Sequence, residues 1–156
     1  MEPLQDSLKE LTNVTFDEIQ VGTSAEVTVT ISQHQIDVAA IVSGDVDAFY
    51  LKGPGGTDVR QEPKRTEASG AEAVISILLG ARLPGPGTRI VHRDLRFSGD
   101  FAAGDRLTAK VTAREKRKKG NLVVFDCRCV NQAGKELVTG TVTVEAPLSR
   151  LVYDVI

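Results

Sequence analysis

The chain has few of the residues that build metal sites or disulfides, with two cysteines and two histidines among 156 residues. Cys127 and Cys129 are separated by one residue in a strand-like run. Side chains at such spacing lie side by side on one face, in a geometry that suits a disulfide poorly. Two cysteines without a histidine cluster are also too few for a structural zinc site. We therefore predict two buried free thiols, no metal and no cofactor.

The chain also lacks an excess of charge of one sign and an apolar N-terminal run. Its 19 Lys+Arg nearly balance 21 Asp+Glu, giving a net charge of −2. This balance predicts no large basic surface that would bind nucleic acid or a membrane. The first thirty residues hold no uninterrupted apolar stretch, so we expect neither a signal peptide nor a membrane span. A cytoplasmic location is the default expectation.

A strand followed by a capped helix is predicted near the N-terminus. Residues 24–31 alternate apolar and polar side chains, which is typical of a half-buried strand. Ser32 and Gln35 then fit a capping box, in which each side chain bonds the backbone N–H of the other residue. Gly44 suits the left-handed residue that follows a helix, so the helix should end there and leave Asp45 on a loop. A Gly-Asp pair is also common in ordinary turns.

A second, almost wholly apolar helix is predicted over residues 67–83. Apart from its ends it has polar side chains only at Ser69, Glu72 and Ser76. A helix that is apolar nearly all round is expected to be buried nearly all round. It is short for a membrane span, which favours a core helix. Residues 49–66 before it are rich in glycine, proline and charge, and they predict a loop.

Four further strands are predicted, with turn residues between them. They are rich in valine, threonine and isoleucine and cover residues 88–97, 106–116, 122–131 and 136–146. Turn residues at 104–105, 120–121 and 134–135 favour antiparallel pairing. One buried helix before a run of long antiparallel strands is an α+β pattern, in which the sheet must curl around the helix. The length and the 41% apolar content indicate one domain, residues 1–156.

Three sequence strings carry a resemblance to a known family. They are LGARLPGPGT at 79–88, DLRF at 94–97 and VFDCRCVNQ at 124–132. The chain resembles the MaoC-like hot-dog (R)-specific enoyl-CoA hydratases, and it looks most like the hydratase domain of bifunctional enoyl-CoA hydratase/phosphate acyltransferases. The likeness covers roughly residues 15–147. It implies a hot-dog fold, in which a curved antiparallel sheet wraps a long central helix, and it implies a homodimer.

The resemblance also implies a catalytic loop and an oxyanion donor. Residues 43–50 (SGDVDAFY) align with the family's Asp-x-Asn-Pro-x-His motif, and Asp45 stands at its first position. In the family an Asp and a His activate water for addition to an enoyl thioester, while a backbone N–H at the start of the central helix polarises the carbonyl. Gly70 matches that N–H position, where a helix N-terminus favours developing negative charge. Gly70 also fits a role in close packing of the helix against the sheet.

Three positions of the motif differ from the family, and at one of them Ala48 replaces the Pro. Tyr50 replaces the His, and a phenol, with a pKa of about 10, is a poorer base at neutral pH than an imidazole. Tyr50 could orient water or anchor the loop. Asp47 replaces the Asn, and it could share a proton with Asp45 or remain a solvated charge. His34 is expected on the surface, about three helical turns from Asp45. His92 is expected on a strand, where it could face solvent, pack in the core or reach the site as a replacement imidazole.

Basic side chains offer contacts for the phosphates of coenzyme A. Arg89, Arg93, Lys116 and Arg117 are the candidates, because guanidinium and ammonium groups bind phosphate readily. Residues 114–119 also fit a solubilising turn or an edge guard.

The predicted ligand is an acyl-CoA or an acyl-carrier thioester. The sequence leaves three functions open: hydration of trans-2-enoyl thioesters, binding without catalysis, and thioester hydrolysis in which Asp45 or Glu72 directs water.

Overall fold

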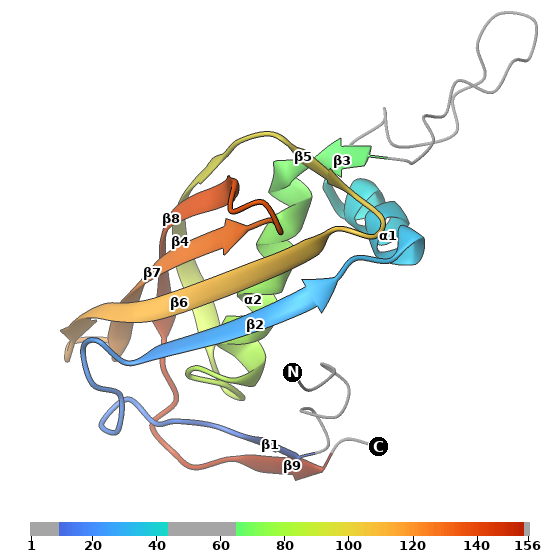
Figure 1. Ribbon diagram of the computed structural model, residues 1–156. Helices are drawn as coiled ribbons and strands as arrows, with labels where there is room; N and C mark the ends of the chain where they lie inside the picture. The colour runs from blue at the N-terminus through green and yellow to red at the C-terminus, as the bar shows by residue number, and fades with distance from the viewer. Residues whose placement is uncertain (1–9, 44–64, 155–156) are drawn as a thin grey trace, which may run out of the picture.

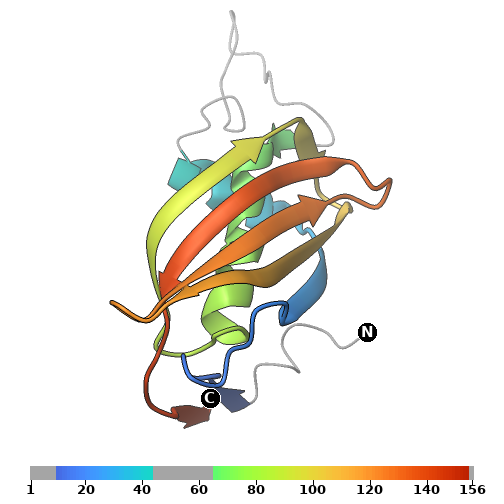
Figure 2. The same cartoon turned by 90° about the vertical axis from the view of Figure 1, so that its left-hand side faces the viewer.

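Five antiparallel strands form one curved sheet around a central helix (Figures 1 and 2). The computed structural model describes residues 10–43 and 65–154. The strand order is β2-β6-β7-β8-β4. The five strands are β2 (Ser24–Thr30), β6 (Arg106–Arg117), β7 (Leu122–Val130), β8 (Glu136–Glu145) and β4 (Arg89–Phe97). The predicted α+β architecture is confirmed.

The sheet has one apolar face, and that face packs against the helix. Along β6 the buried side chains are Leu107, Ala109, Val111 and Ala113, at every second position. Strand β7 alternates in a similar way over its second half, whereas β8 has adjacent buried residues near both of its ends. A period of two places these side chains on one side of a pleated sheet, so the alternation seen in the sequence decides which face meets the helix.

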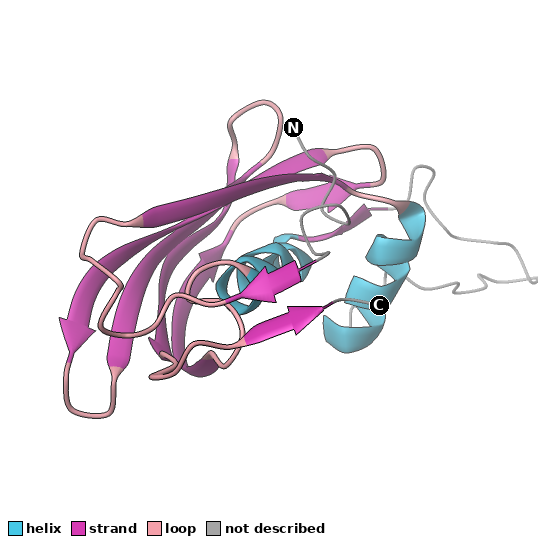
Figure 3. Cartoon of the chain, turned by 90° about the horizontal axis from the view of Figure 1, so that it is seen from below, coloured by secondary structure: helices cyan, strands magenta, loops and turns pink. Residues whose placement is uncertain are grey.

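The central helix is shorter than predicted and is buried on one side only. Helix α2 covers Glu72–Ala81, and a 3-10 turn, η4, covers Ala68–Ala71 before it. Its buried side chains are Val74, Ile75, Leu78 and Leu79. Ile77 on the opposite side is 44% exposed. The expectation of burial nearly all round was wrong for a single chain, because the sheet arches over one side of the helix (Figure 3).

The helix α1 (Gln33–Ser43) begins at the predicted capping box. The Ser32 N–H donates to Gln35 Oε1 over 2.8 Å, and the Gln35 N–H donates to Ser32 Oγ over 3.1 Å. Two backbone donors of the first turn are therefore satisfied reciprocally. The predicted helix end at Gly44 lies just outside the described residues.

Two small strand pairs were not predicted. Strand β3 (Arg65–Glu67) pairs with β5 (Asp100–Ala102), and β1 (Glu10–Thr12) pairs with β9 (Val152–Asp154). Residues 65 and 66 were expected in a loop, and the first residue of the expected helix, Glu67, ends β3. Partners far away in the sequence decide such short strands, and three residues are too few to show a period.

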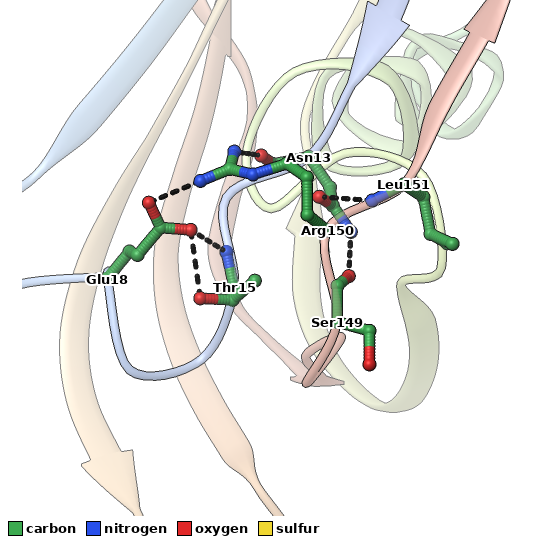
Figure 4. A network of polar contacts seen from close by, with 6 residues as sticks. All are labelled: Asn13, Thr15, Glu18, Ser149, Arg150 and Leu151. Atoms are coloured by element: carbon green, nitrogen blue, oxygen red, sulfur yellow. Dashed lines mark hydrogen bonds and ion pairs between the residues drawn. The ribbon is translucent and has the colours of Figure 1, made fainter.

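A buried asparagine ties the two ends of the described chain together (Figure 4). Asn13 is fully buried, its Nδ2 donates to the carbonyl of Ser149 over 2.8 Å, and its Oδ1 accepts from the Leu151 N–H over 3.0 Å. Arg150 bonds the Asn13 carbonyl and forms an ion pair with Glu18. These contacts fix β9 beside β1, because a buried amide without such partners would be destabilising.

The two cysteines are buried free thiols on β7, as predicted. Burial raises the pKa of Cys127 to about 12 and that of Cys129 to about 11. Since the thiolate is the reactive form, both side chains act as packing groups at neutral pH. No helix within residues 10–43 and 65–154 is long and apolar enough to span a membrane.

Candidate functional site

A pocket of about 680 Å³ lies beside the start of the central helix. Strand β2, the N-terminal part of α1, η4 with the N-terminal part of α2, strand β4 and Phe101 form its walls. Most of its lining is apolar, with contributions from Val27, Val29, Ile31, Val38, Val74, Ile77, Phe97 and Phe101. A concave, mainly apolar pocket with a few polar groups is the usual form of a small-molecule site.

Gly70 lines this pocket from the middle of the 3-10 turn η4. It was expected in the first turn of an α-helix, and the α-helix begins two residues later, at Glu72. Among the described residues, the N-cap positions Glu67 of η4 and Ala71 of α2 form no side-chain capping bond. Backbone donors at a helix start carry partial positive charge and attract an oxygen that becomes negative. The pocket wall therefore suits a carbonyl oxygen at this point.

Glu72 and Arg93 form an ion pair in the pocket wall. Glu72 Oε1 lies 2.7 Å from Arg93 Nε, and the side chains are 26% and 52% exposed. Oε1 is buried and accepts no hydrogen bond from the described residues, so its contact with Arg93 is an ion pair. The sequence marked Glu72 only as an alternative water-directing group, and nothing in it indicated the partner on β4.

His34 also lines the pocket, although it is exposed at the start of α1. It was expected only on the surface. The expectation missed that α1 follows β2 directly and that both border the pocket. His92 is exposed on β4, opposite Thr143, and is not part of the pocket lining.

Three of the four predicted phosphate contacts lie at the other end of the sheet. Arg89 pairs with Glu145 at the start of β4, and Arg117 pairs with Glu115 at the end of β6. The Lys116 ammonium donates to the Ile19 carbonyl over 2.8 Å. Of the four, only Arg93 reaches the pocket. The strand register places Arg89 and Arg117 in the same row, across Glu145 and Leu122, and Arg93 lies four residues farther along β4. The phosphate contacts themselves stay a prediction.

The predicted catalytic residues Asp45, Asp47 and Tyr50 lie outside the described residues. The segment that carries them follows α1, whose first turn borders the pocket. Within residues 10–43 and 65–154, no three His, Cys, Asp or Glu side chains gather in a way that could hold a metal ion.

Comparison with known proteins gives three close likenesses. The chain is 31% identical over 132 residues to an (R)-specific enoyl-CoA hydratase of Rhodospirillum rubrum, covering 85% of this chain and 91% of that protein. It is 28% identical over 147 residues to a 3-hydroxybutyryl-CoA dehydratase of Methylorubrum extorquens, covering 90% and 88%. The unliganded (R)-hydratase PhaJ1 of Pseudomonas aeruginosa superposes with a TM-score of 0.77 at 30% identity, covering 94% of each chain.

A scan of family models gives no match. The likeness to the hydratases nevertheless extends over most of each chain, in sequence and in the course of the backbone. The fold is therefore the predicted hot-dog fold. The chain belongs to the MaoC-like, (R)-specific enoyl-CoA hydratase family.

Proposed function

We propose that this protein hydrates trans-2-enoyl thioesters to (R)-3-hydroxyacyl thioesters and catalyses the reverse dehydration. The observation that carries the proposal is the apolar pocket at the start of the central helix, in a chain 31% identical to an (R)-specific enoyl-CoA hydratase. The apolar walls suit an acyl chain, and the helix start suits the thioester carbonyl. Coenzyme A or an acyl carrier supplies the thiol of the substrate.

The Gly70 N–H is the proposed donor to the thioester carbonyl. Addition of water at C3 moves negative charge onto that oxygen, and a donor already aimed at it stabilises the transition state. Glycine lets the substrate approach the backbone closely. Asp45 is the proposed base. It accepts a proton from water as the oxygen bonds to C3, and the return of that proton from Asp45 to C2 completes the addition and restores the carboxylate.

Tyr50 and Asp47 are proposed to assist the reaction, but neither takes over the acid/base role of the family's histidine. A phenol is a weak base at neutral pH, so Tyr50 is assigned to orienting the water or the carbonyl. Asp47 lies two residues from Asp45 in the sequence, and two close carboxylates can share a proton. Hydration by the natural chain is therefore expected to be slow.

The proposal is tested by incubating the purified protein with crotonyl-CoA and following the loss of the conjugated double bond. Formation of (R)-3-hydroxybutyryl-CoA supports it. Release of free coenzyme A instead would identify a thioesterase, and binding without turnover would identify a non-catalytic acyl-thioester-binding protein. Either result would overturn the hydratase proposal.

Restoring the family motif is expected to raise the hydration rate. The double substitution Asp47→Asn with Tyr50→His returns an imidazole to the loop, and one acid/base group is typically worth about 10²–10⁴-fold in rate. The measurement is kcat/KM for crotonyl-CoA beside that of the natural chain. The single substitution Asp47→Asn is the control. A double variant that binds acyl-CoA but gains no activity would argue against the hydratase assignment.

A homodimer joined through β4 is proposed as the active assembly. In the described sheet β4 has one neighbour, β8, so its other edge is open. Val91 and Phe97 on β4 are each 45% exposed, and Ile77 of α2 is 44% exposed. An open strand edge with apolar side chains favours pairing with a second chain, and a two-fold axis would pair the same edge of both copies.

Light scattering is expected to give the dimer mass at micromolar concentration. Val91→Glu should weaken the dimer by about tenfold or more, since an unpaired charge at an apolar interface costs more than about 1.4 kcal/mol. Val21→Glu is the matched control, because Val21 is a valine exposed by 61% outside β4. A monomer mass for the natural chain, or equal effects of both substitutions, would rule out this interface.

A further inference from the structure

A serine hydroxyl lines the pocket directly beside Gly70. Ser69 and Gly70 are consecutive residues of η4, both are half-buried, and both belong to the pocket lining. The trans peptide between them keeps their Cα atoms about 3.8 Å apart. In a right-handed helical turn the Cα–Cβ bonds and the N–H bonds both point toward the start of the turn. A group that binds at the Gly70 N–H therefore lies within reach of the Ser69 side chain.

The Ser69 hydroxyl is available to a ligand. It forms no hydrogen bond with the residues that the structure describes. The backbone of the same residue is engaged, because the Ser69 carbonyl accepts from the Glu72 N–H. A hydroxyl has one O–H donor, and it rotates to suit the acceptor that it meets. Ser69 can thus donate into the pocket without giving up a contact within the described part of the chain.

A thioester carbonyl at Gly70 would have an acceptor position left for this hydroxyl. A carbonyl oxygen has two lone pairs, so one backbone N–H leaves the second lone pair without a donor. Addition of water at C3 moves negative charge onto that oxygen, and a hydrogen bond to an anionic oxygen is about twice as strong as one to a neutral oxygen. A second donor would therefore stabilise the transition state more than the bound substrate.

We propose that Ser69 is a catalytic residue whose hydroxyl donates to the thioester carbonyl oxygen together with the Gly70 N–H. The inference rests on the proposed acyl-thioester function and adds a second donor to the same site. The hydroxyl keeps its proton throughout. Water adds to C3, Asp45 carries the transferred proton to C2, and Ser69 stabilises the charge that forms on the oxygen between these two steps.

Replacement of Ser69 by alanine tests the donor through its effect on rate. In Ser69→Ala, kcat for crotonyl-CoA should fall by about 10²–10³-fold, the usual cost of removing one donor to a developing oxyanion. The Kd for butyryl-CoA should rise by less than about tenfold, because a hydrogen bond to a neutral carbonyl contributes less. If the natural chain is too slow to compare, the Asp47→Asn/Tyr50→His protein serves as the background.

Ser24→Ala is the control for the rate, since Ser24 is an exposed serine of β2 outside the pocket lining. It should retain the full kcat. A Ser69→Ala protein whose kcat stays within a factor of a few of its background would overturn the proposal. So would a rise in the Kd for butyryl-CoA as large as the loss in kcat, because it would assign Ser69 to binding alone.

Infrared spectroscopy of a bound, non-reacting thioester tests the contact without turnover. Butyryl-CoA labelled with ¹³C at its carbonyl should show a lower C=O stretching frequency on the natural chain than on Ser69→Ala, because a hydrogen bond weakens the C=O bond. Ser76→Ala removes another serine of the pocket lining, four residues beyond Glu72, and should leave the frequency unchanged. An equal frequency on the natural chain and on Ser69→Ala would refute the hydrogen bond.

The outcome is separable from that of the proposed function. Hydration of crotonyl-CoA that persists in Ser69→Ala would refute the second donor and keep the hydratase. A carbonyl frequency that depends on Ser69, in a protein that does not hydrate crotonyl-CoA, would refute the hydratase and keep the donor.

Discussion

Replacement of Asp45 by alanine is expected to lower the rate of crotonyl-CoA hydration by about 10²–10⁴-fold, the usual contribution of one acid/base group. The affinity for a non-reacting thioester such as butyryl-CoA should change little, because a base acts in the transition state and not in binding. The measurements are kcat from initial rates and Kd from calorimetry. If the natural chain is too slow to compare, the Asp47→Asn/Tyr50→His protein serves as the background.

Asp17→Ala is the control for this substitution, since Asp17 is an exposed acid outside the pocket. It should retain the full rate. If Asp45→Ala kept its rate within a factor of a few, Asp45 would not be the base. Equal losses in rate and in thioester affinity would indicate that Asp45 shapes the pocket and performs no chemistry.

Gly140→Ala is expected to destabilise the fold by about 4 kcal/mol or more, the range of severe backbone clashes. Gly140 lies in β8 opposite Leu95 of β4, at a φ of +142°. A Cβ there would lie 2.1 Å from the carbonyl oxygen of Asp94. Because the clash is with a backbone atom, it is relieved only if β4 moves out of the sheet. Strand β4 also carries Arg93 and the proposed dimer edge.

Thermal unfolding measures this effect, with an expected fall in Tm of about 10 °C or more for a chain of this size. Gly134→Ala separates the clash from the cost of the backbone conformation. Gly134 also has a positive φ, +79°, but a Cβ there would meet nothing within 4 Å. Gly134→Ala should lower the free energy of unfolding by about 1–2 kcal/mol. Similar melting temperatures for the two variants would show that β4 accommodates the added methyl group.

The sequence by itself determined the local elements and the family. Alternation along β6 fixed the buried face, and Ser32 with Gln35 fixed the start of α1 through two hydrogen bonds that span only three residues. Asn121, with φ +55°, and Gly120, with φ +82°, formed the predicted turn between β6 and β7, since both residues tolerate the left-handed region. These features depend on neighbours in the chain, and the sequence shows neighbours directly.

Only the tertiary structure decided which residues far apart in the sequence come into contact. Pairing with β5 drew Glu67 into β3, so the α-helix began at Glu72 and Gly70 fell in the 3-10 turn. The pairing of β4 with β8 placed Arg89 beside Glu145, while Arg93, farther along β4, meets Glu72 of α2. One side of helix α2 stays exposed, because the five-stranded sheet packs against the other side only. Charge and composition say nothing about such distances, since strand order and register set them.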